Sequence, residues 1–311
     1  MRPGIVVANA PVSYGAFEVT VGHDPNVPAG LSVLDQVAAA GYAGIDLGPV
    51  GYLGEPARLG EMLAERGLGL AGGYLELPYP DHDALQAALA DLDALLDAFD
   101  AVAPFLGGPA APPPPRPTLA DNGSAARRAR PGCSRADPSQ GLSAGQWRLF
   151  AAGLAQAVAR CRDRGYEPTF HPETGTYVEA PWEIERVLEL SDVGLCLETG
   201  HMLLGGGDPV AMLRSAPERV NHVHLKDARL DVMAQLVAEE APVTGIWERE
   251  AFCVLGKGDL DADGVLAGLA DIGFSGWLVV EQDSFPRTAE RFARAAADQV
   301  ANRAFLAERG L

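Results

Sequence analysis

SGWLVVEQD, residues 275–283, decides the fold class, because an uninterrupted apolar run ends there in a carboxylate. Leu278 to Val280 are all apolar, and Glu281 follows them directly. A strand without polar alternation is buried on both faces, as in parallel sheets covered by helices. LCL at 195–197 repeats the pattern and is followed by Glu198. We therefore expect a parallel sheet inside a layer of helices.

Short β-like runs alternate with helical runs along the chain. The expected strands are 4–11, 44–49, 68–77, 101–108, 167–173, 192–199, 219–227 and 275–283. The expected helices are 30–41, 55–67, 81–99, 145–165, 180–191, 208–218, 261–273 and 288–310, with a partly helical insertion at 231–252. Eight strand–helix units in 311 residues predict an α/β fold, a (β/α)8 TIM barrel with its chemistry at the carboxyl ends of the strands. A doubly wound open sheet is the alternative, although no GxGxxG turn follows the first strand.

Residues 107–140 form a low-complexity range rich in Gly, Pro, Ala and Arg. The strand–helix alternation resumes after it. We therefore interpret the range as a flexible excursion or lid after the fourth strand, and not as a domain boundary. The expected organisation is one barrel domain over residues 1–311.

Charge and composition exclude several classes of partner. The formal net charge is -18, which argues against binding to nucleic acid or to anionic membranes. No run of about 18 apolar residues indicates a transmembrane span, and the N-terminal stretch predicts a first strand and no signal peptide. The four cysteines are widely spaced, so a reducing cytoplasm is expected. A homo-oligomer is compatible with the sequence.

Polar side chains gather at the predicted carboxyl ends of the last four strands. They are His171, Glu173 and Glu179, then Glu198 and His201, then His222, His224, Lys226 and Asp227, and finally Glu281 and Asp283. In a barrel these ends meet at one mouth. A mixture of nitrogen and oxygen donors suits Mn²⁺, Co²⁺, Mg²⁺ or Zn²⁺ better than a thiolate site does.

Four of these residues invite different interpretations. Glu281 ends a buried strand and needs a partner, for which a cation is the natural choice. Glu179 precedes Ala180-Pro181 and could instead be a charge that favours a helix N-terminus. His222 and His224 lie two residues apart and share a face, so we expect His224 at the rim and His222 deeper or in packing.

These stretches resemble the xylose isomerase-like TIM-barrel superfamily of sugar isomerases and epimerases, and most of all its inosose dehydratase-like members. The similar stretches are GYAGIDLGPVGYL, HPETGT, CLETGH, GDPVAML, VNHVHLKDARLDVM, FCVLGKGDLD and GFSGWLVVEQD. The resemblance implies one divalent metal ion, first Mn²⁺ or Co²⁺ and then Mg²⁺ or Zn²⁺, held at the ends of the fifth to eighth strands.

Carried over by position, the resemblance implies four metal ligands. They are Glu198, His224, Glu281 and, from the fifth strand, Glu173 or alternatively Glu179. The expected substrate-binding residues are His171, Glu179, His201, Lys226 and Asp227. Two departures stand out: Glu198 replaces the family's aspartate, and His171-Pro172-Glu173 replaces a segment of three histidines.

Such a site supports removal of a proton from the carbon next to a carbonyl, through an enediolate that the metal stabilises. Glu173 and Glu281 are the expected catalytic acid and base. The first hypothesis is therefore an isomerase or epimerase of a small sugar or polyol ketone. The second is an inosose-type dehydratase, favoured by the KDARLDVM stretch. The third is a barrel that binds a sugar without turnover.

Overall fold

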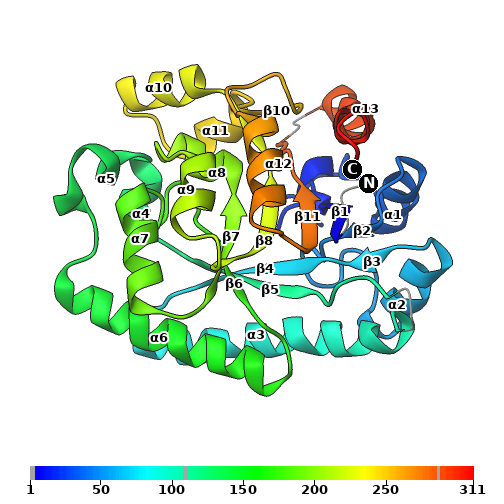
Figure 1. The fold of residues 1–311 in the computed structure, drawn as a ribbon, viewed down its shortest axis with the longest axis horizontal. Coiled ribbons are helices and arrows are strands. Elements are labelled where there is room, and N and C mark those ends of the chain that lie inside the picture. The colour runs from blue at the N-terminus through cyan, green and yellow to red at the C-terminus, as the bar shows by residue number, and fades with distance from the viewer. Residues whose placement is uncertain (1–3, 108–110, 286–287) are drawn as a thin grey trace.

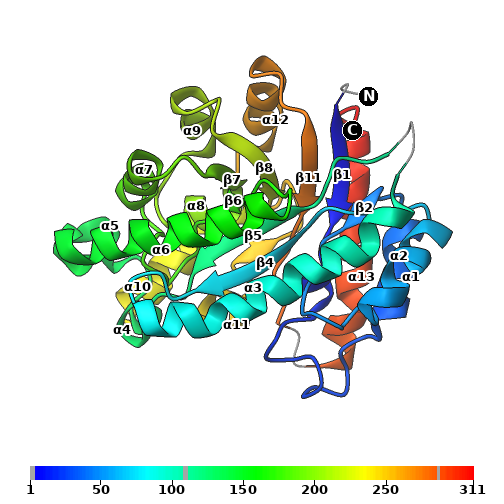
Figure 2. The ribbon, with the colours of Figure 1, turned by 90° about the horizontal axis from the view of Figure 1, so that it is seen from below.

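The computed structural model describes residues 4–107, 111–285 and 288–311. Its main sheet is parallel, with the strand order β3-β2-β1-β11-β8-β7-β6-β5-β4, and helices surround it (Figures 1 and 2). The strands are β1 Ile5–Asn9, β2 Gly44–Ile45, β3 Gly69–Leu70, β4 Gly72–Leu77, β5 Arg116–Asp121, β6 Thr169–Phe170, β7 Gly194–Glu198, β8 Val220–Leu225 and β11 Gly276–Val280. A separate antiparallel pair joins β9 Asp227–Ala228 to β10 Phe252–Cys253.

The segment 69–77 closes the sheet into a barrel. Ala71 separates β3 from β4, and its N–H donates to the Ile45 carbonyl at 2.9 Å. The Ala71 carbonyl accepts from the Arg116 N–H at 3.0 Å. One continuous segment thus bonds to β2 on one side and to β5 on the other, so nine strands occupy eight barrel positions. The TIM-barrel prediction is confirmed.

Helices follow most strands and cover the barrel. They are α1 Gly30–Ala39, α2 Pro56–Glu65, α3 His82–Val102, α4 Ala125–Ala129, α5 Cys133–Ala136, α6 Ala144–Asp163, α7 Pro181–Leu190, α8 Thr199–Leu204, α9 Pro209–Ser215, α10 Leu230–Ala238, α11 Thr244–Glu248, α12 Ala262–Asp271 and α13 Ala289–Ala307. The long helices α3 and α6 lie side by side along the barrel (Figures 1 and 2). Asp81 caps α3 by accepting from the Ala84 N–H, and Ser143 caps α6. None of the helices described is long and apolar enough to cross a membrane.

The prediction of a fourth strand at 101–108 is wrong. Helix α3 continues to Val102, and Ala103–Phe105 forms a 3-10 helix. The fourth barrel strand is β5, which lies within the range 107–140. Its sequence, RPTLAD, hides the strand because Pro117 lacks an N–H for the ladder. Proline is tolerated there because β6 pairs with β5 only from Thr118 onward.

The interpretation of 107–140 as an excursion after the fourth strand is corrected by the same finding. After β5 this range forms α4, α5 and a 3-10 helix, Pro138–Gln140. Four of its polar side chains are buried: Thr118, Asp121, Arg127 and Ser134. The range therefore supplies one barrel strand and part of the barrel's packing, while its expected flexibility stays a prediction.

Alternate residues of the strands point into the barrel and form its interior in layers. On β11, Trp277 and Val279 fill the amino-terminal part, and Glu281 follows at the carboxyl end. The Trp277 ring packs where Gly44 and Gly69 have no side chain, since an added Cβ would lie 2.6 and 2.7 Å from it. The barrel thus has a packed floor, and the polar residues lie above it.

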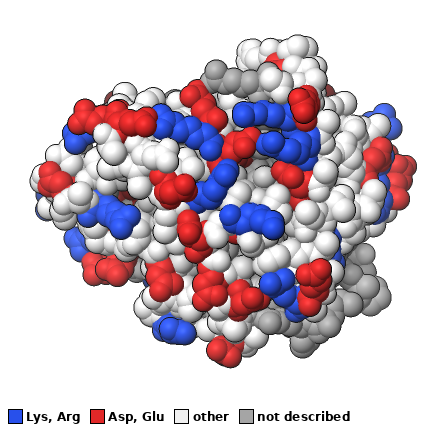
Figure 3. Space-filling model, turned by 90° about the horizontal axis from the view of Figure 1, so that it is seen from above, with Lys and Arg blue, Asp and Glu red and all other residues white. Residues whose placement is uncertain are grey.

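Acidic and basic side chains are interspersed on the face shown in Figure 3. The formal net charge is -18, so the chain has no general excess of cations with which to bind a polyanion.

Candidate functional site

A cavity of about 810 Å³ opens at the carboxyl ends of the barrel strands. Charged residues that follow β6, β8 and β11 line it: His171, Glu173, Lys226, Glu281 and Asp283, together with His224 of β8. The predicted meeting of strand ends at one mouth is therefore confirmed for these residues.

Four side chains converge at this mouth. His171, Glu198, His224 and Glu281 each offer one donor atom, and these atoms all lie within 4.8 Å of one another. Glu198 Oε2 is 3.3 Å from His171 Nε2 and 3.3 Å from His224 Nδ1. The same His224 Nδ1 is 3.2 Å from Glu281 Oε2. The four residues come from the ends of β6, β7, β8 and β11, which are neighbours in the sheet. We call them the donor cluster.

Unsatisfied polar atoms in the donor cluster fit a divalent metal. Glu198 Oε2, His171 Nδ1 and both ring nitrogens of His224 are buried without a hydrogen bond to any described residue. Buried polar atoms are normally paired, so such a group needs an explanation. Two imidazoles and two carboxylates form a donor set that Mn²⁺, Co²⁺ or Zn²⁺ accepts.

The start of α8 orients Glu198 within the cluster. Its Oε1 accepts the Gly200 N–H at 3.0 Å and the His201 N–H at 3.4 Å, so the carboxylate caps the helix. This leaves Oε2 for the cluster. Burial alone would raise the pKa of Glu198, but the charge of Lys226 and the nearby imidazoles hold it well below its usual range. Glu198 is therefore an ionised, fixed ligand candidate.

Glu173 lies beside the donor cluster and not within it. Its Oε2 is 3.4 Å from His171 Nδ1, and its Oε1 is 3.2 Å from His201 Nε2. Burial raises the pKa of Glu173 to about 8. The structure thus exchanges two predicted positions: His171, expected on the substrate side, is in the cluster, and Glu173, expected as a ligand, faces the cavity next to it.

Lys226 carries a positive charge at the mouth of the barrel. Its Nζ is 2.9 Å from Glu281 Oε2 and 2.8 Å from Asp283 Oδ1, and it lies over the Phe252 ring at 4.9 Å from the ring centroid. The neighbouring carboxylates raise the pKa of Lys226 well above its usual value, against the effect of burial. An ammonium held in this way can donate hydrogen bonds to a hydroxyl of a bound molecule.

Three residues expected to bind substrate lie outside the cavity lining: His201, which contacts Glu173 from behind, and Glu179 and Asp227. Glu179 forms an ion pair with Arg127 at 3.1 Å and accepts the Gly132 and Gly175 N–H groups. It is therefore not available as the alternative ligand. Asp227 accepts backbone N–H groups, three of them from the loop that follows β10, namely those of Gly256, Gly258 and Leu260. Its carboxylate organises that loop.

His222 and Cys196 form a layer beneath the donor cluster, as expected for His222. The rings of His222 and His224 are 5.0 Å apart. Two smaller groups of donor atoms also converge, Asp46 with both histidines and Cys196 with His171 and His224. Burial raises the pKa of the Cys196 thiol well above its usual value, which disfavours the thiolate that a metal binds. The four-residue cluster is therefore the better site.

The sequence interpretation missed several residues of the cavity. Asp46 follows β2, and its Oδ2 is 3.6 Å from His224 Nε2. Tyr74 of β4 contacts the His171 ring edge-on at 5.2 Å. Asp46 could have been found by applying to the early strands the strand-end rule used for the last four, whereas Tyr74 lies within β4 and not at its end. The aromatic residues Phe17, Trp247 and Phe285 come from loops or short helices and carried no such signal.

Comparison with known proteins agrees with this fold. The family model described as a xylose isomerase-like TIM barrel matches residues 34–304. The inosose dehydratase of Geobacillus kaustophilus (strain HTA426) is 29% identical over 272 residues, which cover 85% of this chain and 83% of the relative.

Two solved structures share the fold at low sequence identity. A probable 3-DHS dehydratase, AsbF, from Bacillus anthracis has a TM-score of 0.66 and 12% identity, with 97% of this chain and 98% of that chain covered. An L-ribulose 3-epimerase has a TM-score of 0.63 and 16% identity, with 97% and 93% covered.

Proposed function

The chain belongs to the xylose isomerase-like TIM-barrel family, and we propose that it removes the proton next to the carbonyl of a sugar or polyol ketone with the help of a divalent metal ion. The observation that carries this proposal is the donor cluster at the cavity, beside a separate acid–base pair, Glu173 and His201. A metal bound there would polarise the carbonyl and stabilise negative charge on its oxygen.

The protein's own residues supply the proton transfers and the orientation of the substrate. Glu173 lines the cavity and its carboxylate contacts His201, so it is placed to take or return a proton. Thr174 fixes the His201 ring, because its N–H and hydroxyl lie 3.2 and 2.9 Å from Nδ1. Lys226 and Asp283 offer a donor and an acceptor to substrate hydroxyls.

Dehydration is the outcome we favour. Glu173 stands apart from the donor cluster, so it can deliver a proton to a departing hydroxyl while a second group removes the carbon-bound proton. The inosose dehydratase relative matches along most of its length, which supports the same outcome. Isomerisation or epimerisation is the second candidate, since Glu173 and Glu281 both line the cavity and could exchange a proton with one carbon.

Exchange of substrate protons in D₂O tests the proposal before the substrate is known. Protein treated with a chelator is reloaded with Mn²⁺ or Co²⁺ and offered inososes, ketohexoses and keto-polyols. We expect exchange next to the carbonyl in the loaded protein, faster by about 10²-fold or more than in the chelated protein. A product lighter by one water indicates dehydration, and an inverted or isomeric product indicates the second candidate. Neither exchange nor a new product with any ketone, although metal is bound, would refute both.

Paired variants distinguish the two fifth-strand residues. His171→Gln should weaken metal binding by at least about tenfold, because it removes a donor from the cluster. Glu173→Gln should keep the metal and slow proton exchange by about 10²-fold. Metal titrations of both variants, together with the exchange assay, show which of the two residues binds the metal and which transfers the proton. Loss of metal in Glu173→Gln alone would restore Glu173 as the ligand.

A further inference from the structure

The cavity is larger than a small sugar ketone requires. Its volume is about 810 Å³. At about 30 Å³ per water-sized group this holds on the order of 27 such groups, roughly twice the number of non-hydrogen atoms in a six-carbon polyol ketone. A ketone bound at the donor cluster would therefore leave much of the cavity to a second group of atoms.

Aromatic rings from three separate segments line the cavity. They are Phe17 of the loop after β1, Trp247 of α11, and Phe285 of the segment after β11. Their ring centroids are 6.2 Å apart for Phe17 and Trp247, 5.7 Å for Phe17 and Phe285, and 6.4 Å for Trp247 and Phe285. We call these three residues the aromatic wall. Val19, which also lines the cavity, has 66% of its surface exposed, so apolar surface continues to the rim.

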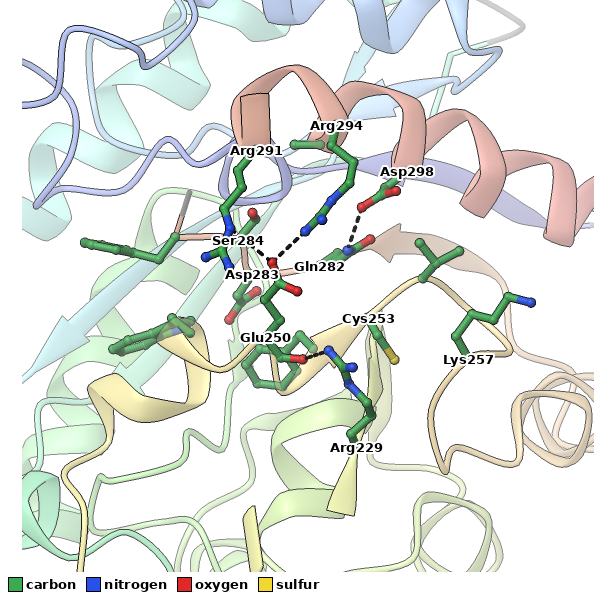
Figure 4. Close-up of a pocket in the computed structure, with 15 residues that line it drawn as sticks. Arg229, Glu250, Cys253, Lys257, Gln282, Asp283, Ser284, Arg291, Arg294 and Asp298 are labelled. Atoms are coloured by element: carbon green, nitrogen blue, oxygen red, sulfur yellow. Dashed lines mark hydrogen bonds and ion pairs between the residues drawn. The ribbon is translucent and has the colours of Figure 1, made fainter. Parts of the chain in front are cut away.

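Ionic contacts join the end of α11 to α13 near the aromatic wall. Figure 4 shows a smaller neighbouring cavity that shares Trp247, Asp283 and Phe285 with the main one. There the carboxylate of Glu250, three residues after Trp247, pairs with Arg294 of α13 at 2.5 Å, while its backbone carbonyl accepts from Arg229. The end of α11, which carries Trp247, thus lies next to α13.

The charges near the aromatic wall indicate what kind of group fits it. Among the described residues, Glu18, the neighbour of Phe17, lines the cavity, and so do Glu76 and Arg128, which pair with each other at 3.0 Å. An anionic group beside Phe17 would meet the Glu18 carboxylate. A neutral, flat, apolar group would instead bury its surface against three rings that prefer stacked or edge-on contacts.

We infer that the substrate is a keto-sugar that carries an aromatic ring, an aryl glycoside whose sugar ring holds the ketone. The inference rests on the proposed function, since it places the ketone at the donor cluster. The aromatic ring lies against Phe17, Trp247 and Phe285, and the enzyme selects substrates by that ring in addition to the sugar.

The phenyl and methyl glycosides of one keto-hexose test the inference, with an inosose alongside. Full burial of an aromatic ring predicts that kcat/KM for proton exchange is about 10- to 100-fold higher for the phenyl glycoside than for the methyl glycoside. Calorimetry measures the same preference as a difference in binding affinity between the two glycosides. The inference can therefore be tested even if neither glycoside is turned over. If the inosose exchanges and the two glycosides bind equally, the inference is overturned while the proposed function stands. Tighter binding of a keto-disaccharide than of the phenyl glycoside also overturns it.

Two alanine variants locate the preference. Trp247→Ala should lower the phenyl-to-methyl ratio by about tenfold, because it removes the largest ring of the wall. Phe105→Ala is the matched control, since this phenylalanine is 40% exposed in a 3-10 helix and does not line the cavity. An unchanged ratio in Trp247→Ala, with binding of the phenyl glycoside retained, would place the aromatic ring elsewhere and overturn the inference.

Discussion

Glu281→Gln should lower turnover by about 10³-fold or more and weaken metal binding, while the fold stays intact. Glu281 ends β11 with only 7% of its surface exposed, and its Oε2 lies 3.2 Å from His224 Nδ1 and 2.9 Å from Lys226 Nζ. Burial alone would raise its pKa, but His224 and Lys226 lower it, so the group is an anion in the folded protein. An amide keeps the shape and removes the charge that the metal and Lys226 both face.

Metal content and proton exchange are measured on the same preparation of Glu281→Gln. Glu61→Gln is the control, because Glu61 lies on the exposed side of α2 and outside the cavity. The unfolding midpoint of each variant shows whether the fold persists. Full activity in Glu281→Gln would mean that the donor cluster is not the reaction centre.

Two of the last barrel strands, β7 and β11, were predictable because their sequences combine two independent signals. Their continuous apolar runs indicate burial on both faces, and a carboxylate directly after each run places the barrel mouth. β5 ends in a carboxylate, Asp121, but has no continuous apolar run. Pro117 and the preceding prolines resemble a linker, and the pairing of β5 with β4 and β6 is a tertiary effect that no local pattern reveals.

The sequence predicted which strand ends form the candidate site. It did not predict which residue takes which position within the site. His171 and Glu173 lie two residues apart, and only the turn after β6 decides which one points at Glu198. The resemblance to relatives favoured a carboxylate there, whereas the geometry puts the imidazole of His171 in the cluster. Glu179 could not be assigned from sequence either, because its partner, Arg127, is 52 positions away in a range that seemed unstructured.

Arg127→Met should lower the free energy of unfolding by about 3–5 kcal/mol, because it leaves two buried carboxylates without their cation. Arg127 Nη1 donates to Glu183 Oε1 at 2.9 Å, and Nη2 lies 3.1 Å from Glu179 Oε1. The arginine side chain is 3% exposed, and those of both glutamates are 0% exposed. The contact ties α4, after β5, to the start of α7, after β6, so its loss should loosen two neighbouring loops.

Arg128→Met is the matched control, because it is the next residue of the same helix and its side chain is 47% exposed. Its pair with Glu76 lies near the surface, so we expect a loss below about 1 kcal/mol. Urea unfolding of both variants gives the comparison. Equal losses would show that helix propensity or packing, and not the buried charges, accounts for the effect.

The dependence of this loss on pH identifies the buried carboxylates as its cause. Burial raises the pKa of Glu179 to about 7 even with Arg127 present, so the folded state already binds a proton more tightly than the unfolded chain. A raised carboxyl pKa contributes stability that is complete below the unfolded value, near 4.3, and is lost as pH rises through the folded value. Without Arg127 the folded pKa rises further, so Arg127→Met should lose more stability at pH 8 than at pH 5. Adding Glu179→Gln to Arg127→Met should remove most of that difference, because the group whose pKa is raised by burial is then absent. A loss that is the same at both pH values would contradict a role for charge and leave the packing of the arginine side chain as the cause.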